Sequence, residues 1–138
     1  MAGLTRTSIS IESELLQRFL KLSRRQGMAN CSEAIRHLMR EALVREEWET
    51  DAEIVGTITI VYDHHKRDLT DRLTSIQHDH HELILSSMHV HLDHDNCLEV
   101  IAVQGPAGRV QKIADSLIGT RGVKHGKVSA TTTGRRMK

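Results

Sequence analysis

The sequence predicts an α+β protein with two parts, a small βαα domain followed by a ferredoxin-like βαββαβ domain. Two observations support this prediction. Within the first 45 residues the spacing of apolar side chains changes from alternation to helical periodicity, and beyond a charged linker the segments read strand, helix, strand, strand, helix, strand. We place the first domain at residues 1–50 and the second at residues 51–138. The cores must be aliphatic, because the chain has only one residue each of Phe, Trp and Tyr.

The βαα domain opens with a half-polar strand of period two. One face of this strand carries Thr7, Ile9 and Ile11, and the other carries Arg6, Ser8 and Ser10. From Glu12 onward the apolar residues follow the helical period, up to Gly27, which is a natural helix terminator. A second helix follows, which either Asn30 or Ser32 can cap.

A single strand with two short helices can neither satisfy its own backbone hydrogen bonds nor bury enough apolar surface, so this domain needs a partner. A second copy of the chain would supply one by pairing the two strands into an antiparallel ribbon. Arg6, Ser8 and Ser10 would then face outward on a ribbon that fits the major groove of DNA. The first 45 residues carry eight Lys and Arg against four Asp and Glu, and this excess of positive charge favours the same partner.

The second domain is predicted from six successive segments. They are a strand at 54–63, a helix at 66–81, a hairpin of strands at 83–92 and 97–105, a helix at 107–122 and a strand at 123–132. This order predicts four antiparallel strands with both helices on one face of the sheet.

The register of the hairpin follows from its apolar rows. We expect these rows to lie under the helices, so that Val90 pairs with Leu98, because a slip by one residue would turn a whole row outward. This register leaves a three-residue turn at Asp93–Asp95.

The same register brings histidines and a cysteine together. It sets His91 across from Cys97 and His89 across from Glu99, with opposed Cβ atoms about 5 Å apart, on the face that we expect to be free of helices. The apolar neighbours of this patch predict that another subunit covers it. A lone strand histidine is usually a surface residue and a lone cysteine a small buried hydrophobe, but three such residues in one register favour a metal site.

The remaining ligand and the metal stay open on this evidence. The fourth ligand could be His78, His80 or His81, which crowd the end of a predicted helix. Imidazole with thiolate suits nickel, copper or zinc, and not magnesium or calcium. An enzyme with an open His/His/Cys site is an alternative, but the chain offers no general base beyond Glu99 and no evident substrate cleft, so we expect no enzymatic activity.

No apolar run approaches the roughly 18 residues that a membrane span needs, and no leader pattern opens the chain. We therefore expect a cytoplasmic protein without a membrane partner. The two cysteines, Cys31 and Cys97, are too few to indicate a disulfide framework.

Five segments, "SEAIR", "VYDHHKRDL", "QHDHH", "HVHLDHDNCLE" and "RGVKHG", closely resemble the nickel-responsive transcriptional repressors of the NikR family over nearly the whole chain. The resemblance implies a ribbon-helix-helix DNA-binding domain joined to a ferredoxin-like, ACT-type domain that forms the core of a homotetramer, a dimer of dimers. It implies one square-planar Ni(II) per subunit. The implied ligands are His89, His91 and Cys97 of one subunit with His78 of a neighbour, and Tyr62, Gln77 and Glu99 match positions that support the ligands.

On the DNA side, Arg6, Ser8 and Ser10 match the base-reading positions of the family. Lys66 and Arg67 match positions that approach DNA phosphates when nickel is bound. Some relatives have a second acidic residue one helical turn after the Glu of "SEAIR" and hold a second cation there. This chain has Glu33 followed by His37, which departs from that pattern.

The resemblance thus implies a nickel-dependent repressor that binds a palindromic operator of nickel-uptake genes. The alternative within the same class is a ribbon-helix-helix regulator that senses another transition metal, such as copper or zinc.

Overall fold

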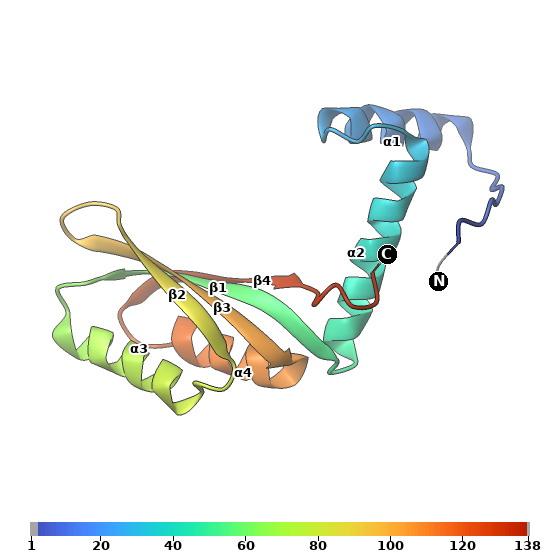
Figure 1. The fold of residues 1–138 in the computed structure, drawn as a ribbon. Helices are drawn as coiled ribbons and strands as arrows, with labels where there is room; N and C mark the ends of the chain where they lie inside the picture. Colours follow the sequence, from blue (N-terminus) through green and yellow to red (C-terminus); the bar gives the residue numbers. More distant parts are fainter. Residues whose placement is uncertain (1–2, 138) are drawn as a thin grey trace. The chain divides into compact units, whose positions relative to one another are not determined.

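The computed structural model describes residues 3–137, and Figure 1 shows the order of its elements. The chain divides into two compact units. One holds the chain up to Leu43 together with the residues after Arg135, and the other is Val44–Arg135. Among the described residues, no helix combines the length and the apolarity that crossing a membrane requires.

The first unit contains helix α1, Ser13–Arg25, and most of helix α2, Cys31–Glu49. Gly27 follows α1 with a φ of 82°, a left-handed conformation that suits glycine at a helix end. The side-chain oxygen Oδ1 of Asn30 accepts a hydrogen bond from the backbone N–H of Glu33 at 2.8 Å, so Asn30 is the residue that caps α2.

Residues 3–12 form neither a helix nor a strand in this single chain. The predicted strand at the start of the βαα domain is therefore not formed here. The physical reason is that a strand needs a neighbour for its N–H and C=O groups, and these residues pair with no strand of their own chain. A ribbon made with a second copy stays a prediction.

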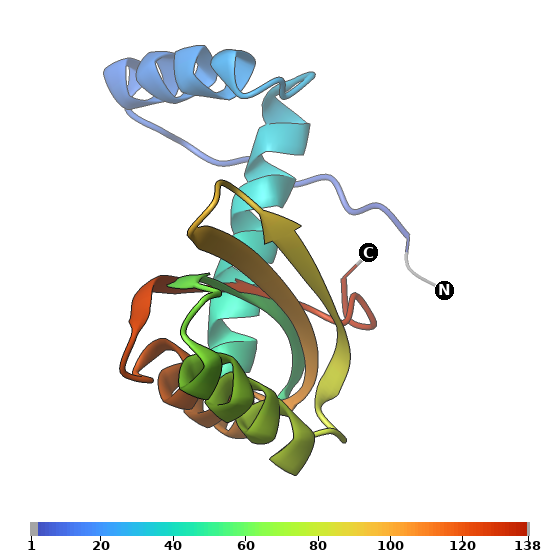
Figure 2. The ribbon, with the colours of Figure 1, turned by 90° about the vertical axis from the view of Figure 1, so that its left-hand side faces the viewer.

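The second unit confirms the predicted βαββαβ order. Its elements are β1 Glu53–Asp63, α3 Arg67–Asp79, β2 Ile84–His91, β3 Asn96–Pro106, α4 Ala107–Ile118 and β4 Val123–Thr131. The four strands form one antiparallel sheet in the order β2-β3-β1-β4. This is the ferredoxin-like arrangement, and Figure 2 shows both α3 and α4 on the same side of the sheet.

The core lies between the sheet and these two helices. β1 contributes Ile58 and Ile60, and β3 contributes Ile101, all fully buried. Leu73 of α3 and Ile113 of α4 pack against them in the same cluster. In the sheet Ile58 lies across from Ile101, so the two central strands present one aliphatic face to the helices.

The predicted choice of sheet face for the hairpin is wrong. Cys97 and Glu99 lie in the same alternating row as Ile101 and are buried with it, so the helices cover the face that carries the predicted metal ligands. The opposite face carries the row that includes Met88, which is 57% exposed. The prediction that another subunit covers the apolar neighbours of the cysteine is wrong for Leu83, Ile101 and Val103, which are buried in the core cluster with residues of α3 and α4. Leu85 is 57% exposed, so for this neighbour the prediction stays open.

Candidate metal centre

The hairpin of β2 and β3 has the predicted register. His91 lies across from Cys97, His89 from Glu99 and Val90 from Leu98. The turn at 93–95 is held by the side chain of Asp93, whose Oδ1 accepts hydrogen bonds from the backbone N–H groups of Asp95 at 2.9 Å and Asn96 at 2.8 Å. The predicted opposition of imidazole and thiol is therefore confirmed.

A buried carboxylate organises the residues around His89. Glu99, only 2% exposed, accepts hydrogen bonds from the Tyr62 hydroxyl at 3.3 Å and from the Gln77 side-chain amide at 3.1 Å. The ring of His89 also joins this network. Its Nε2 lies 3.3 Å from Glu99 Oε2, and its Nδ1 lies 3.4 Å from the Tyr62 hydroxyl. Both ring nitrogens are therefore engaged in the metal-free chain, and His89 would have to release one of these contacts to bind a metal while the other orients the ring.

Tyr62 is suited to donate in this network. Burial raises the pKa of its phenol well above the ordinary value, and the neighbouring Glu99 and Cys97 raise that pKa further. The hydroxyl therefore stays protonated at neutral pH. The side chain of Gln77 comes from the last turns of α3, and its hydrogen bond to Glu99 joins that helix to the buried face of the sheet.

The donor set fits Ni(II). Thiolate and imidazole are ligands that nickel accepts readily, and the chain presents two imidazoles on β2 and one buried thiol on the neighbouring strand β3. Within the described single chain, the ligand atoms of His89, His91 and Cys97 do not all lie within 4.8 Å of one another. His78, the predicted fourth ligand, is exposed in the last turn of α3, directly after Gln77.

The remaining predicted residues lie outside the hairpin of β2 and β3 in the chain. Lys66 precedes α3 and Arg67 is its first residue, both exposed. Arg6, Ser8 and Ser10 are exposed in the segment without regular structure.

The carboxylate of the predicted second cation site is already paired with two arginine side chains. Glu33 accepts a hydrogen bond from Arg36 at 2.7 Å and pairs with Arg40 at 3.4 Å. The hydrogen bond and positive charge of Arg36, with a smaller contribution from Arg40, hold the pKa of the Glu33 carboxyl below its ordinary value. His37 is exposed on the same helix. A cation at Glu33 and His37 would have to compete with both arginines for the carboxylate.

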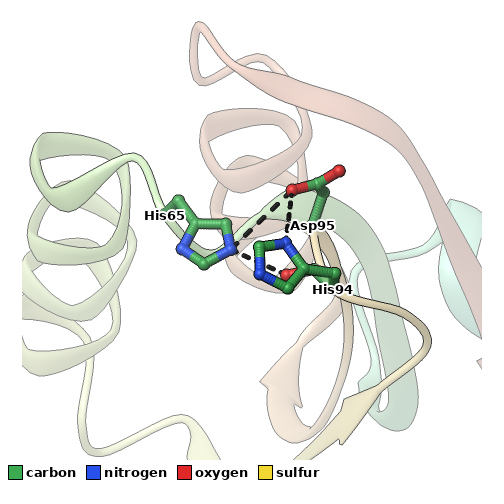
Figure 3. Close-up of side chains that lie close together, drawn as sticks. All are labelled: His65, His94 and Asp95. Atoms are coloured by element: carbon green, nitrogen blue, oxygen red, sulfur yellow. Dashed lines mark hydrogen bonds and ion pairs between the residues drawn. The ribbon is translucent and has the colours of Figure 1, made fainter.

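One cluster was missed by the sequence analysis. His65, which follows the end of β1, lies beside His94 and Asp95 of the hairpin turn (Figure 3). The signal was available, because Asp63 pairs with Asn96 and the antiparallel order of β1 and β3 places "DHH" and "DHD" at the same end of the sheet.

The fold and the donor set together define a metal-binding protein with a ferredoxin-like domain. Comparison with known proteins identifies the family. Residues 55–131 match the model described as the NikR C terminal nickel binding domain.

Relatives of the same kind match over nearly the full chain. A nickel-responsive regulator of Solibacter usitatus is 54% identical over 139 aligned positions, covering 100% of both chains. One from Nitratidesulfovibrio vulgaris is 55% identical over 97% of each chain, and one from Thermococcus onnurineus is 51% identical over 97% of this chain and 98% of that protein. The chain belongs to the NikR family of nickel-responsive regulators. The resemblance noted in the sequence is thereby confirmed, and so are Ni(II) as the metal and the assignment as a regulator rather than an enzyme.

Proposed function

We propose that the protein is a nickel-dependent transcriptional repressor that acts in the cytoplasm on a palindromic DNA operator, that of nickel-uptake genes. The observation that carries this proposal is the hairpin register, which opposes His91 to Cys97 beside an imidazole held by a buried carboxylate. In a family of nickel-responsive regulators, this donor set supports binding of the regulating Ni(II) at the hairpin.

The metal centre of the proposal lies between subunits. His89, His91 and Cys97 of one subunit and His78 of another bind one Ni(II) per subunit, and Tyr62, Gln77 and Glu99 hold the ligands in place. Two features support this assignment. The three hairpin donors do not close around an ion by themselves, and His78 is exposed at a helix end where another chain can meet it. The ion, when bound, supplies a link between subunits and thereby favours one arrangement of the homotetramer.

DNA binding is assigned to the first unit. Residues 3–12 pair with the same residues of a second copy, and the resulting ribbon presents Arg6, Ser8 and Ser10 to the bases of the major groove. The first unit supports pairing of this kind because it exposes large apolar side chains, including Ile9 at 61%, Leu15 at 58% and Leu38 at 51%. These side chains line an apolar hollow that a second copy would cover.

Lys66 and Arg67 add sequence-independent contacts with DNA phosphates in the nickel-bound state. Both are exposed and lie side by side at the start of α3, where long basic side chains are free to reach a phosphate backbone.

The test measures binding of an operator fragment to the full-length protein without metal and with Ni(II), Cu(II) or Zn(II), at fixed salt. We expect tight binding with Ni(II) alone and an absorption band from a thiolate–nickel bond. Cys97→Ser should lose both while the matched control Cys31→Ser keeps both. Arg6→Ala should abolish operator binding with the band intact.

Two results would contradict the proposal in different ways. Equal DNA affinity with all three metals or with none would remove nickel as the switch. A response to copper or zinc alone would favour a ribbon-helix-helix regulator of that metal.

A further inference from the structure

We propose that Trp48 and Asp51 are positioning residues of the nickel response, an inference that rests on the function proposed above. Together the two side chains form a clamp, which fastens the C-terminal end of α2 to the sheet and to α4. Helix α2 runs without a break across the boundary of the two compact units, which lies between Leu43 and Val44. The clamp therefore holds the end of the helix that joins the metal-binding unit to the unit proposed to bind DNA.

The indole of Trp48 attaches the last turn of α2 to two neighbouring strands. Its Nε1–H donates to the backbone carbonyl of Thr131, at the end of β4, at 2.9 Å. A Cβ placed on Gly56 of β1 would lie 3.2 Å from the six-membered ring of the indole, so the ring lies directly against this glycine. Trp48 is half-buried and packs against the core cluster. One residue earlier, Glu47 Oε2 accepts a hydrogen bond from the hydroxyl of Thr132 at 2.9 Å.

The side chain of Asp51 attaches the residues after α2 to the start of α4. Its Oδ1 accepts a hydrogen bond at 2.6 Å from the N–H of Gly108, which lies in the first turn of α4, where backbone N–H groups have no acceptor within the helix. The carbonyl of the next residue, Ala52, accepts a bond from the N–H of Ala107 at 3.0 Å. Pro106, the residue before α4, makes no side-chain cap, so a carboxylate from the end of α2 takes that role.

The backbone of this junction is folded. Among residues 3–137, Asp51 is the one non-glycine residue with a positive φ, at 59°, a conformation that aspartate tolerates better than most side chains. The N–H of Ala52 donates to the carbonyl of Glu47 at 3.0 Å, which closes the end of the helix. Only residues 50–52 lie between α2 and β1. The sequence reads here as a charged linker, but the structure shows a tight turn.

The clamp matters because two sites are coupled only when a change at one alters the other. If the end of α2 swivelled freely, the unit proposed to bind DNA would move independently of the metal, and the coupling free energy would be close to zero. With its end held against β1 and α4, α2 must follow any movement of the sheet. β1 pairs directly with β3, the strand that carries Cys97, so the metal-binding hairpin and the end of α2 share one sheet. Loss of the clamp should weaken the coupling and leave metal binding intact.

The test compares the operator affinity of the full-length protein with and without Ni(II), at fixed salt. Trp48→Ala and Asp51→Ala should each lower the ratio of the two affinities by about fivefold or more, while the thiolate–nickel band and the metal-free affinity for DNA stay unchanged. Trp48→Phe keeps a ring against Gly56, and Asp51→Asn keeps an oxygen acceptor at the same position. Both of these conservative variants should therefore retain most of the nickel dependence.

A matched control separates positioning from loss of stability. Gly126→Ala crowds Ile118, outside the clamp, so it should destabilise the chain and leave the nickel dependence of operator binding unchanged. Amide hydrogen exchange of residues 47–52 should quicken in Trp48→Ala and Asp51→Ala and not in Gly126→Ala. Unchanged exchange in both clamp variants, or an equal loss of nickel dependence in Gly126→Ala, would overturn the inference.

Failure of this inference can be told apart from failure of the proposed function. If the unmodified chain binds the operator equally with and without nickel, the proposed function fails and this inference fails with it. If the unmodified chain, Trp48→Ala and Asp51→Ala all show the full nickel dependence, the proposed function stands, and Trp48 and Asp51 are not positioning residues.

Discussion

Tyr62→Phe should destabilise the metal-free protein without changing the shape of its core. The substitution removes a hydroxyl that donates to Glu99 at 3.3 Å, and that carboxylate is only 2% exposed, so water cannot replace the lost partner. A hydrogen bond to a charged group contributes about 1.5–3 kcal/mol, and the length of this one places it near 1.5 kcal/mol. For a domain of about 60–100 residues this corresponds to a melting temperature lower by about 6–12 °C.

The assay is urea and thermal unfolding at one protein concentration, because assembly would otherwise change the apparent stability. The matched control is a double-mutant cycle with Glu99→Leu. With leucine at position 99 the Tyr62 hydroxyl has no carboxylate to which it can donate, so Tyr62→Phe should lower the free energy of unfolding by less than about 0.5 kcal/mol. An equal cost in both backgrounds would refute the account of Glu99 as the centre of the network, because the tyrosine would then act through packing alone.

Two further predictions concern the same domain. In the metal-free protein, stability should be complete below about pH 10 and fall as the pH rises beyond it, because folding raises the pKa of Tyr62 and the native state then holds a proton that the unfolded state has lost. Tyr62 is the single tyrosine, so phenolate absorbance reports its titration directly, and ionisation at the ordinary pKa in the folded protein would contradict this. Gly126→Ala should cost about 1–3 kcal/mol, because a Cβ there would lie 2.5 Å from Cγ1 of Ile118. Ile118→Ala in the same chain should recover part of that loss in urea unfolding, and no recovery would place the strain elsewhere.

The hairpin register could be predicted from the sequence because alternation leaves few choices. Two strands joined by a short turn can pair in only a few ways, and a slip by one residue moves every side chain to the other face. The pairing of His91 with Cys97 therefore followed from local pattern alone. The local pattern left the cap of α2 open between Asn30 and Ser32, and the structure shows that it is Asn30.

The face of the sheet could not be read from the hairpin itself, because both of its rows contain apolar residues. The central strand β1 decides it. There Ile58 and Ile60 alternate with Thr57 and Thr59, and the isoleucine row lies in register with Ile101. Burial of that row carries Cys97 and Glu99 under the helices, although a glutamate is not a typical core residue. The alternation of β1, rather than that of the hairpin, therefore indicates which face of the sheet is buried.

The strand order places the segments that carry His65, His94 and Asp95 at the same end of the sheet, but it does not predict that these side chains meet. These residues lie just outside regular strands, where side-chain direction depends on turn geometry rather than on alternation. Only the pairing of the ends of β1 and β3 brings them together, and only the capped turn at Asp93 aims them at one another.

The buried carboxylate of Glu99 also links the β2–β3 hairpin to helix α3. Glu99 bonds at once to His89 of the sheet and to Gln77, the residue before His78. On the proposed function, Glu99 therefore contacts both a hairpin ligand of its own chain's metal site and the helix α3, which supplies His78 to the metal site of a neighbouring subunit. α3 is about 20 Å long at 1.5 Å per residue. Its first residue is Arg67, which directly follows Lys66, and Gln77 lies near its C-terminal end. On the same proposal, a change at the metal end of this helix would reach the residues proposed to contact DNA phosphates. Gln77→Leu should weaken this coupling, reducing the nickel dependence of operator binding more than the metal-free affinity for DNA, and an equal effect on both would argue that α3 carries no signal.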